Sequence, residues 1–255
     1  MQKDRKRFKK ALKQGTPQLG MFVQSTDPVV IELAGIAGFD FVVVDLEHGG
    51  VYYNCVEGMC RAADAADIDI IVRIPFVTPN NVFRPLDSGA TGIQAPQVND
   101  AETARLVATN AKYAPAGCRG GARPRSSLWG SRPDYFREAN DETAVVVHCE
   151  TKECVENIDA VLSVPGIDVV FAGPQDLSHS YGVPGDTANP VVQEAIAAML
   201  QAAKKHGVAA GIFVGSPEDA KKRIEQGFTY LLFANDQSLL LTMLRNTVKA
   251  VGLQG

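Results

Sequence analysis

One segment carries the pattern that decides the fold of this chain: Phe41-Val42-Val43-Val44-Asp45-Leu46-Glu47-His48-Gly49-Gly50. Its first four residues are apolar and three of them are β-branched, which is typical of a strand buried on both faces. Two acids and a histidine follow, and two glycines then let the chain turn sharply. A buried strand that ends in polar groups at a turn indicates a parallel sheet with functional side chains along one edge.

The same pattern recurs along all 255 residues. Short β-branched runs predict eight strands, and stretches of helical periodicity separate them. The rival fold, an open doubly wound sheet, would favour a G-x-G-x-x-G motif after the first strand, and the sequence has none there. Because the length also suits one α/β barrel, we expect a single (β/α)8 TIM barrel domain over residues 1–255. The predicted strands are 19–24, 39–45, 68–75, 92–96, 144–150, 167–172, 208–214 and 230–233, and the clearest predicted helices are 101–113, 153–162, 190–206 and 217–226.

The composition limits the classes of function. Apolar residues make up 45% of the chain, charged residues 21%, and the formal net charge is −4, which argues against a nucleic-acid or anionic-membrane partner. No apolar run is long enough to span a bilayer. The five cysteines form no C-x-x-C pair, which argues against structural zinc or disulfides and favours the cytosol. Basic residues cluster near the start, where we expect an amphipathic helix: Lys3, Arg5, Lys6, Arg7, Lys9, Lys10 and Lys13.

Polar side chains follow several predicted strands, at the end where a barrel carries its active site. Glu150 ends the fifth strand and Asp176 follows the sixth. Two carboxylates without cysteine ligands suit a hard cation such as Mg²⁺ or Mn²⁺. The alternative is that both acids cap the next helix or bridge to a loop. Arg73 and His48, at other strand ends, favour a site, because buried carboxylates without a cation are costly.

Arg73 and His48 each have two interpretations. Arg73 ends an apolar strand, so it either donates to a substrate oxygen that gains negative charge or forms an internal salt bridge with Asp45 or Glu47. His48 is either a general base, with a pKa suited to proton transfer, or a loop residue that orders the following glycine turn. We favour the functional role for Arg73 and leave both open for His48.

His148 shares a strand face with Glu150, because side chains alternate along a strand. We therefore expect His148 to point towards the barrel axis and to hydrogen-bond beside the metal rather than to bind it. A second polar feature is the glycine-rich and basic stretch 115–125. It could cradle a phosphate with backbone N–H groups, although it lacks the Walker lysine-serine ending, and a long functional loop or a subunit contact is the favoured interpretation.

These segments together resemble the HpcH/HpaI class II aldolases, a family that includes aldolases of 4-hydroxy-2-oxoheptanedioate and of 2-dehydro-3-deoxyglucarate. The D-x-E-H and G-P-x-D-L-S motifs are the most specific part of the resemblance, which extends over almost the whole chain in the right order. The matching segments are 39–48, 72–75, 86–89, 113–120, 148–151 and 166–178.

The resemblance implies roles for individual residues. Glu150 and Asp176 would hold Mg²⁺, Mn²⁺ or Co²⁺, and Arg73 would bind the keto oxygen of pyruvate. His48 would act as the acid/base group, supported by Asp45 and by Asp87, the latter from a neighbouring subunit. The resemblance also implies a hexamer whose C-terminal helix is exchanged between subunits. Two departures put the substrate range in question: histidine at 148, where the family usually has glutamine, and Gly49-Gly50 in place of alanine-proline.

We therefore expect a cytoplasmic, metal-dependent class II aldolase whose ligands are a small 2-oxo acid and an aldehyde. It would cleave 4-hydroxy-2-oxo acids reversibly through an enolate of pyruvate. Arg73, Gly173, Gln175, Asp176 and His148 would border the substrate, with backbone N–H groups near Gln175 and Asp176 holding its carboxylate.

Three alternatives remain open in the sequence. A Schiff-base aldolase needs a lysine inside the barrel, but the predicted strand interiors hold none, and Lys152 falls at the start of the next helix. A metal-dependent barrel lyase acting on acyl-CoA esters or phosphoenolpyruvate would use the arginines of 119–125 for phosphate. The third alternative is a barrel that binds 2-oxo acids without catalysing a reaction, in which the same residues would serve binding only.

Overall fold

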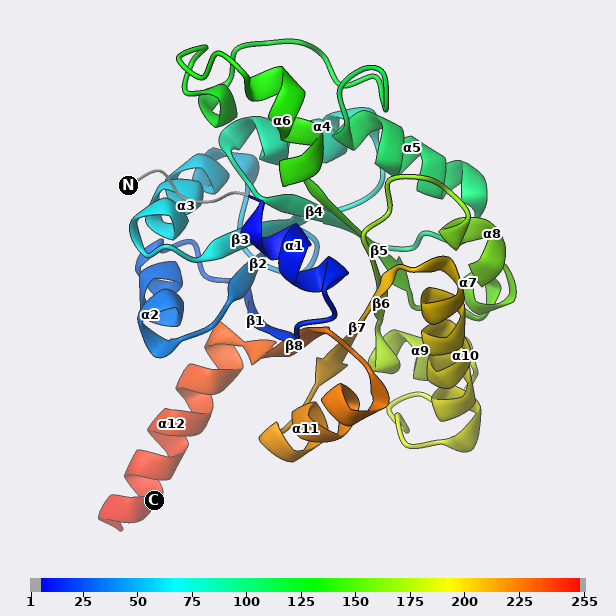
Figure 1. Ribbon diagram of the computed structural model, residues 1–255. Helices are drawn as coiled ribbons and strands as arrows, with labels where there is room; N and C mark the ends of the chain where they lie inside the picture. Colours follow the sequence, from blue (N-terminus) through cyan, green and yellow to red (C-terminus); the bar gives the residue numbers. More distant parts are fainter. Residues whose placement is uncertain (1–5, 253–255) are drawn as a thin grey trace.

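The computed structural model describes residues 6–252 and forms a closed barrel of eight parallel strands, each paired with its neighbours in sequence order and β8 with β1 (Figure 1). Helices surround the strands, so the expected (β/α)8 TIM barrel is confirmed. The strands are β1 (Gln18–Val23), β2 (Phe41–Asp45), β3 (Asp69–Arg73), β4 (Gly92–Ala95), β5 (Ala144–Cys149), β6 (Val169–Ala172), β7 (Ala209–Val214) and β8 (Tyr230–Asn235).

All eight predicted strands are confirmed to within two residues at each end. The largest overrun is at β3, which was expected to continue to Pro75 but ends at Arg73. Proline has no N–H for the ladder, so the pairing stops just before it. The β-branched runs are apolar on both faces, and the closed barrel covers one face with helices outside and the other with side chains inside.

The helices that follow the strands are in the expected places. Those predicted at 190–206 and 217–226 match exactly in bounds, whereas the stretch 153–162 divides into two short helices at Asn157. At the break, the Asn157 side chain donates to Asn99 O (3.0 Å), a residue that is distant in the chain. The helices are α1 (Arg7–Lys13), α2 (Val29–Ala37), α3 (Tyr53–Ala65), α4 (Pro79–Ser88), α5 (Ala101–Ala111), α6 (Tyr135–Glu142), α7 (Lys152–Glu156), α8 (Ile158–Leu162), α9 (Pro174–Ser180), α10 (Pro190–His206), α11 (Pro217–Gln226) and α12 (Asp236–Val251), with a 3₁₀ turn at Arg125–Ser127.

The inside of the barrel is filled by one side-chain set and the space under the helices by the alternate set. On β5, Val146 belongs to the inner cluster and Val145 and Val147 to the outer one. The same alternation turns the Asp45, Arg73 and His148 side chains inward at the ends of their strands, as the period of two predicted for His148. The inner cluster consists of Phe8, Leu12, Phe22, Phe41, Val43, Ile71, Ala144, Val146, Val169, Phe171, Tyr230 and Leu232.

Helix α1 closes the N-terminal end of the barrel, across which it lies in Figure 1. Phe8 and Leu12, one turn apart, are buried, and the Phe8 ring meets Phe41 edge-on with centroids 5.2 Å apart. Lys10 and Lys13 lie on the opposite, solvent-facing side. The predicted amphipathic helix is therefore present for the described residues, and Lys3 and Arg5 lie outside them.

Helix α12 projects away from the barrel (Figure 1) and leaves most of its apolar side chains in solvent. Only Asp236, in its first turn, is buried. Within residues 6–252, no helix is long and apolar enough to cross a membrane. The exposed apolar side chains of α12 are Leu240, Leu241, Met243, Leu244, Val248 and Val251.

Candidate active site

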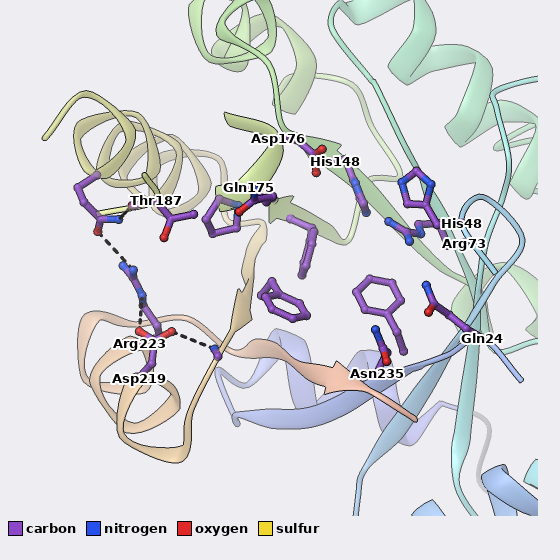
Figure 2. Close-up of a pocket in the computed structure, with 17 residues that line it drawn as sticks. Gln24, His48, Arg73, His148, Gln175, Asp176, Thr187, Asp219, Arg223 and Asn235 are labelled. Carbon is purple, nitrogen blue, oxygen red and sulfur yellow. Dashed lines mark hydrogen bonds and ion pairs between the residues drawn. The ribbon is translucent and has the colours of Figure 1, made fainter. Parts of the chain in front are cut away.

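The C-terminal ends of the strands surround a cavity of about 610 Å³ (Figure 2). Arg73, His48 and Asp176 line it, as the sequence predicted, together with His148, Gly173 and Gln175. A second, smaller cavity of about 160 Å³ adjoins the same residues and is lined by Glu47, His48, Gln97, Glu150, Thr151, Asp176 and Ser180. Residues from four separate strand ends thus meet at one place.

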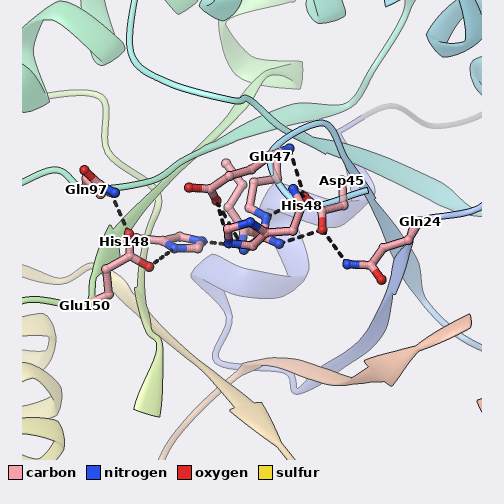
Figure 3. Close-up of polar contacts among 9 residues, drawn as sticks. Gln24, Asp45, Glu47, His48, Gln97, His148 and Glu150 are labelled. Carbon is pink, nitrogen blue, oxygen red and sulfur yellow. Dashed lines mark hydrogen bonds and ion pairs between the residues drawn. The ribbon is translucent and has the colours of Figure 1, made fainter. Parts of the chain in front are cut away.

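Glu150 is buried and held by two hydrogen bonds (Figure 3). Its Oε1 accepts from the backbone N–H of Gln97 at 2.8 Å, and its Oε2 accepts from His148 Nδ1 at 2.6 Å. Burial alone would raise the pKa of Glu150, but His148 and the Gln97 N–H outweigh it and lower the pKa to about 2. The carboxylate is therefore ionised and oriented at neutral pH, with lone pairs left for a cation.

A buried chain of hydrogen bonds orients His148. The Tyr230 hydroxyl donates to Gln94 Oε1 (2.6 Å), which turns Gln94 Nε2 towards His148 Nε2 (2.6 Å). Because Nε2 then accepts, Nδ1 carries the hydrogen that is donated to Glu150. The Phe171 ring packs beside the imidazole, with centroids 4.9 Å apart. Side chains from three more strands thus fix a single carboxylate.

Asp176 approaches Glu150 across Gly173, the residue before α9. A Cβ on Gly173 would lie 3.1 Å from Asp176 Oδ2 and 3.4 Å from Glu150 Oε2, so the missing side chain leaves room for both oxygens. Within the described chain the Asp176 carboxylate has no hydrogen bond or ion pair, and the residue is exposed to the cavity. The interpretation of Asp176 as a helix-capping group has no contact to support it.

The two acids fit a divalent cation that takes its remaining ligands from water or substrate. Among residues 6–252, no three His, Cys, Asp or Glu side chains come close enough to form a complete metal cage. Mg²⁺ and similar ions are commonly held by one or two carboxylates with open positions for substrate oxygens. An unpaired Asp176 beside an ionised Glu150, with a small cavity between them, is a donor set of this kind.

Arg73 is held by Asp45 at the neighbouring strand end. Its Nε and Nη2 donate to the two Asp45 oxygens at 2.9 and 2.6 Å, and its Nη1 lies 3.4 Å from Glu47 Oε2. Burial would raise the pKa of Asp45, but the Arg73 bonds hold it below its usual value, whereas burial raises the pKa of Glu47 despite Arg73. The internal salt bridge is thus real, and the guanidinium still faces the cavity, stacked 4.5 Å over the Phe22 ring.

His48 stands at the rim of the cavity, with its side chain 62% exposed. Its Nε2 lies 3.8 Å from Glu47 Oε2, while the Asp45 carboxylate accepts from the His48 backbone N–H rather than from its ring. The turn after it needs glycine, because a Cβ on Gly49 would lie only 2.5 Å from Asp45 O. A residue with a side chain at position 49 would therefore not fit this turn beside His48.

Asp87 does not reach this site within its own chain. It lies in the last turn of α4, where it accepts from Arg119 Nη2 at 2.6 Å. Arg119 borders Thr91 and Thr143, which precede β4 and β5, so both residues lie at the N-terminal end of the barrel. Arg125 of the same loop pairs with Asp64 (2.6 Å). The basic stretch 115–125 is thus used in ion pairs far from the site, and a phosphate-binding role has no geometric support within one chain.

Several residues of the site were not singled out from the sequence. Gln94 and Tyr230 face the barrel interior and orient His148, and a polar residue inside the short strand β4 was the available signal for Gln94. Phe22 and Phe171 pack against Arg73 and His148, and apolar rings gave no such signal. Arg223, on α11, lines the same cavity from a helix rather than from a strand end.

A closed parallel barrel with polar side chains gathered at the C-terminal ends of its strands has the architecture of the TIM-barrel enzymes, whose active sites lie at that face. The comparison with known proteins makes the identification specific. The chain belongs to the HpcH/HpaI aldolase/citrate lyase family, whose pattern matches residues 18–242. It is a carbon–carbon lyase of the aldolase type.

Two relatives from Klebsiella pneumoniae and one solved structure show how far the similarity extends. The chain is 37% identical to a 4-hydroxy-2-oxo-heptane-1,7-dioate aldolase over 91% of its own length and 89% of the relative. It is 33% identical to a 5-keto-4-deoxy-D-glucarate aldolase over 90% of each chain. A crystal structure of an HpcH/HpaI aldolase/citrate lyase family protein from Burkholderia cenocepacia superimposes with a TM-score of 0.92, at 31% identity over 96% of this chain and 99% of that one.

Proposed function

We propose that the chain is a divalent-metal-dependent aldolase that cleaves 4-hydroxy-2-oxo acids reversibly to pyruvate, or a related 2-oxo acid, and an aldehyde. The observation that carries the proposal is the pair of carboxylate oxygens of Glu150 and Asp176 around Gly173, beside a cavity that Arg73 and His48 also line. Mg²⁺, Mn²⁺ or Co²⁺ are the ions we expect there, since oxygen ligands suit all three.

Glu150 and Asp176 would hold the cation, which when bound supplies a Lewis acid for the developing enolate. Gly173, Gln175 and His148 border the place where the 2-oxo acid would lie. Arg73 donates to the keto oxygen as negative charge arrives there, and the Asp45 carboxylate keeps the guanidinium in position.

His48 is the proposed acid/base residue. In cleavage it removes the proton from the C4 hydroxyl, directly or through a water molecule, as the C3–C4 bond breaks and its electron pair passes into the enolate. The same imidazole returns the proton in synthesis. Its exposed position at the rim suits a group that exchanges protons with solvent.

The test is pyruvate C3–H exchange in D₂O by NMR, followed by a retro-aldol screen of 4-hydroxy-2-oxo acids coupled to lactate dehydrogenase. We expect exchange and pyruvate release with added metal and loss of both with EDTA. Borohydride with pyruvate should leave the protein unlabelled, because β1 to β8 contain no lysine. Exchange that survives EDTA, together with borohydride labelling, would overturn the proposal in favour of a Schiff base.

We further propose a cytoplasmic homo-oligomer in which α12 packs against a neighbouring subunit, and in which the neighbour's copy of Asp87 supports the base. The support is the apolar side of α12, which is exposed in the single chain. Sedimentation velocity should give a hexamer, and truncation before residue 240 should give smaller species. A full-length chain that sediments as a monomer contradicts the exchanged helix.

A further inference from the structure

The last and first strands of the barrel, β8 and β1, meet in an irregular seam at the catalytic end. Gly20 of β1 pairs with Leu232 of β8. Two residues further along β1, Phe22 pairs with Asn235, so β8 contains one extra residue over this interval. Ala234 lies in the interval with a φ of 55°, a left-handed conformation that is strained for a residue with a side chain. Extra residues of this kind bend a strand and change the direction of the side chains that follow, often next to active sites.

Directly after this bend, Asp236, the first residue of α12, reaches the end of β1. Its buried carboxylate accepts from the backbone N–H groups of Gln24 and Ser25 at 2.9 and 3.0 Å. Hydrogen bonds from backbone N–H groups to a charged carboxylate are stronger than those between neutral groups. Helix α12 otherwise projects away from the barrel (Figure 1), so this contact ties its first turn to the catalytic end.

Gln24 connects this contact to the residues around Arg73. Its side-chain Nε2 donates to Asp45 Oδ2 at 2.9 Å (Figure 3), and the same oxygen accepts from Arg73 Nη2 at 2.6 Å. An ionised carboxylate only accepts, so the NH₂ group of the Gln24 amide must face Asp45. The Gln24 backbone also packs against the turn that follows His48, since a Cβ on Gly49 would lie 3.2 Å from Gln24 Cα.

Asp45 in turn decides where the Arg73 guanidinium lies. It is completely buried, and its Oδ1 accepts from the backbone N–H groups of Glu47 and His48 at 3.1 Å each. In the described chain, Gln24 is the only donor to Oδ2 apart from Arg73. Without Gln24, Arg73 alone would hold that oxygen, and the two side chains could shift together. A shift of about 1 Å in a catalytic group can cost on the order of 10²-fold in rate.

We propose that Gln24 and Asp236 are positioning residues for Arg73, so that the first turn of α12 belongs to the catalytic apparatus. The inference rests on the proposed function, in which Arg73 donates to the oxygen that becomes negative. Asn235 lines the cavity, but within the described chain Asp236 does not, so Asp236 acts through other residues. The residues that transmit its position are, in order, Gln24, Asp45 and Arg73.

The test measures pyruvate C3–H exchange in the metal-loaded, full-length protein. Gln24→Met removes the donor to Asp45, and Asp236→Asn leaves one oxygen to accept where two accepted before. Each should lower kcat about fivefold to thirtyfold and change KM for pyruvate less than about threefold, because Arg73 contributes most as charge develops. Asp100→Asn changes an acid that accepts a backbone N–H, from Thr103 at 2.7 Å, at the start of α5. It is the matched control and should keep the wild-type rate.

The decisive comparison repeats both substitutions in the Arg73→Met background. Residues that act through Arg73 have nothing left to position there, so the rates should equal that of Arg73→Met alone to within about twofold. A general loss of structure would reduce the rate by the same factor in both backgrounds. Such additive losses, unchanged rates in the wild-type background, or a KM that changes as much as kcat would overturn the proposal.

Two further outcomes are distinct. A loss in Gln24→Met with the wild-type rate in Asp236→Asn would overturn the connection to α12 and make Gln24 a direct substrate contact. Absence of exchange in the wild type would show that the proposed function itself is wrong.

Discussion

Both ends of the barrel bury charged side chains, but within residues 6–252 the C-terminal end also carries a carboxylate without a hydrogen-bonding partner. At the N-terminal end, Lys9 and Lys112 donate to Thr143 O at 2.9 and 2.5 Å, and Lys9 pairs with Asp168 at 3.0 Å. At the C-terminal end, the Asp176 carboxylate has no hydrogen bond or ion pair in the described chain. Asp176 is exposed in the first turn of α9, where a helix favours an acid, but no ion pair with a described residue offsets its charge beside the ionised Glu150.

The difference teaches how one fold separates stability from function. The N-terminal end is closed by α1, and its buried lysines have partners in Asp168 and in backbone carbonyl groups. The C-terminal end keeps an open cavity and an excess of carboxylates, whose charge a bound divalent cation would offset. Substitutions at the two ends should therefore change different measurements.

The largest effect should come from Glu150→Gln, which removes charge from the proposed metal site but keeps the side-chain shape. We expect pyruvate exchange to fall at least about 10³-fold, because a bound cation contributes several kcal/mol to an enolate-like transition state. Metal affinity measured by calorimetry should fall with it, while circular dichroism stays unchanged. Glu57→Gln, a half-exposed acid on α3 that pairs with Arg61 far from the cavity, is the matched control. Unaltered metal affinity would remove Glu150 from the site.

Arg73→Met should lower the exchange rate about 10²–10³-fold, the usual cost of losing one donor to a developing oxyanion. It should also destabilise the protein by roughly 3 kcal/mol, because the buried Asp45 carboxylate loses its partner. The double variant Arg73→Met/Asp45→Asn separates the two effects: stability should return in urea titrations and activity should not. Recovery of both would reduce Arg73 to a structural role.

The sequence predicted the fold well because local signals define it. Each buried run such as Phe41 to Val44 is recognisable alone, and the period of two along a strand correctly turned His148 inward. Sequential pairing of parallel strands with helical crossovers leaves few topologies to choose from. The division of 153–162 at Asn157 depends on one contact with Asn99, 58 residues away, and could not be seen locally.

The site was only partly predictable, because many of its contacts join residues that are distant in the chain. Strand-end acids and Arg73 stand out in the sequence, but their partners are distant in the chain, as with Gln94 and Tyr230, 136 residues apart. Arg223 lies among other charges on a solvent-facing helix, where nothing local distinguishes it from its neighbours. Arg223 is recognised only because it lines the cavity, and the cavity forms only once the barrel has closed.

Phe8→Ala tests the closed end of the barrel. The ring is buried against Phe41 and Tyr230, and its loss should cost about 3 kcal/mol of unfolding free energy. Pyruvate exchange per folded molecule, measured well below the melting temperature, should stay at the wild-type rate. A drop in exchange without a drop in stability would mean that the two ends are coupled rather than separate.

The smallest effect should be a pH dependence of stability that comes from Lys112. Burial lowers its pKa to about 7, against the opposing attraction of Asp168, whereas the unfolded chain keeps the ordinary value of 10.5. Between these values the unfolded state binds more protons, so this group makes the protein more stable as the pH rises. The gain between pH 7.5 and 8.5 should be about 1 kcal/mol in urea titrations.

Lys112→Met should lose this gain because the amine that titrates is gone. The Thr143 carbonyl keeps a partner in that variant, since Lys9 still donates to it. The exposed Lys221→Met should keep the gain. An identical pH profile for wild type and Lys112→Met would mean that Lys112 stays protonated in the folded barrel, so that the closed end holds its full positive charge.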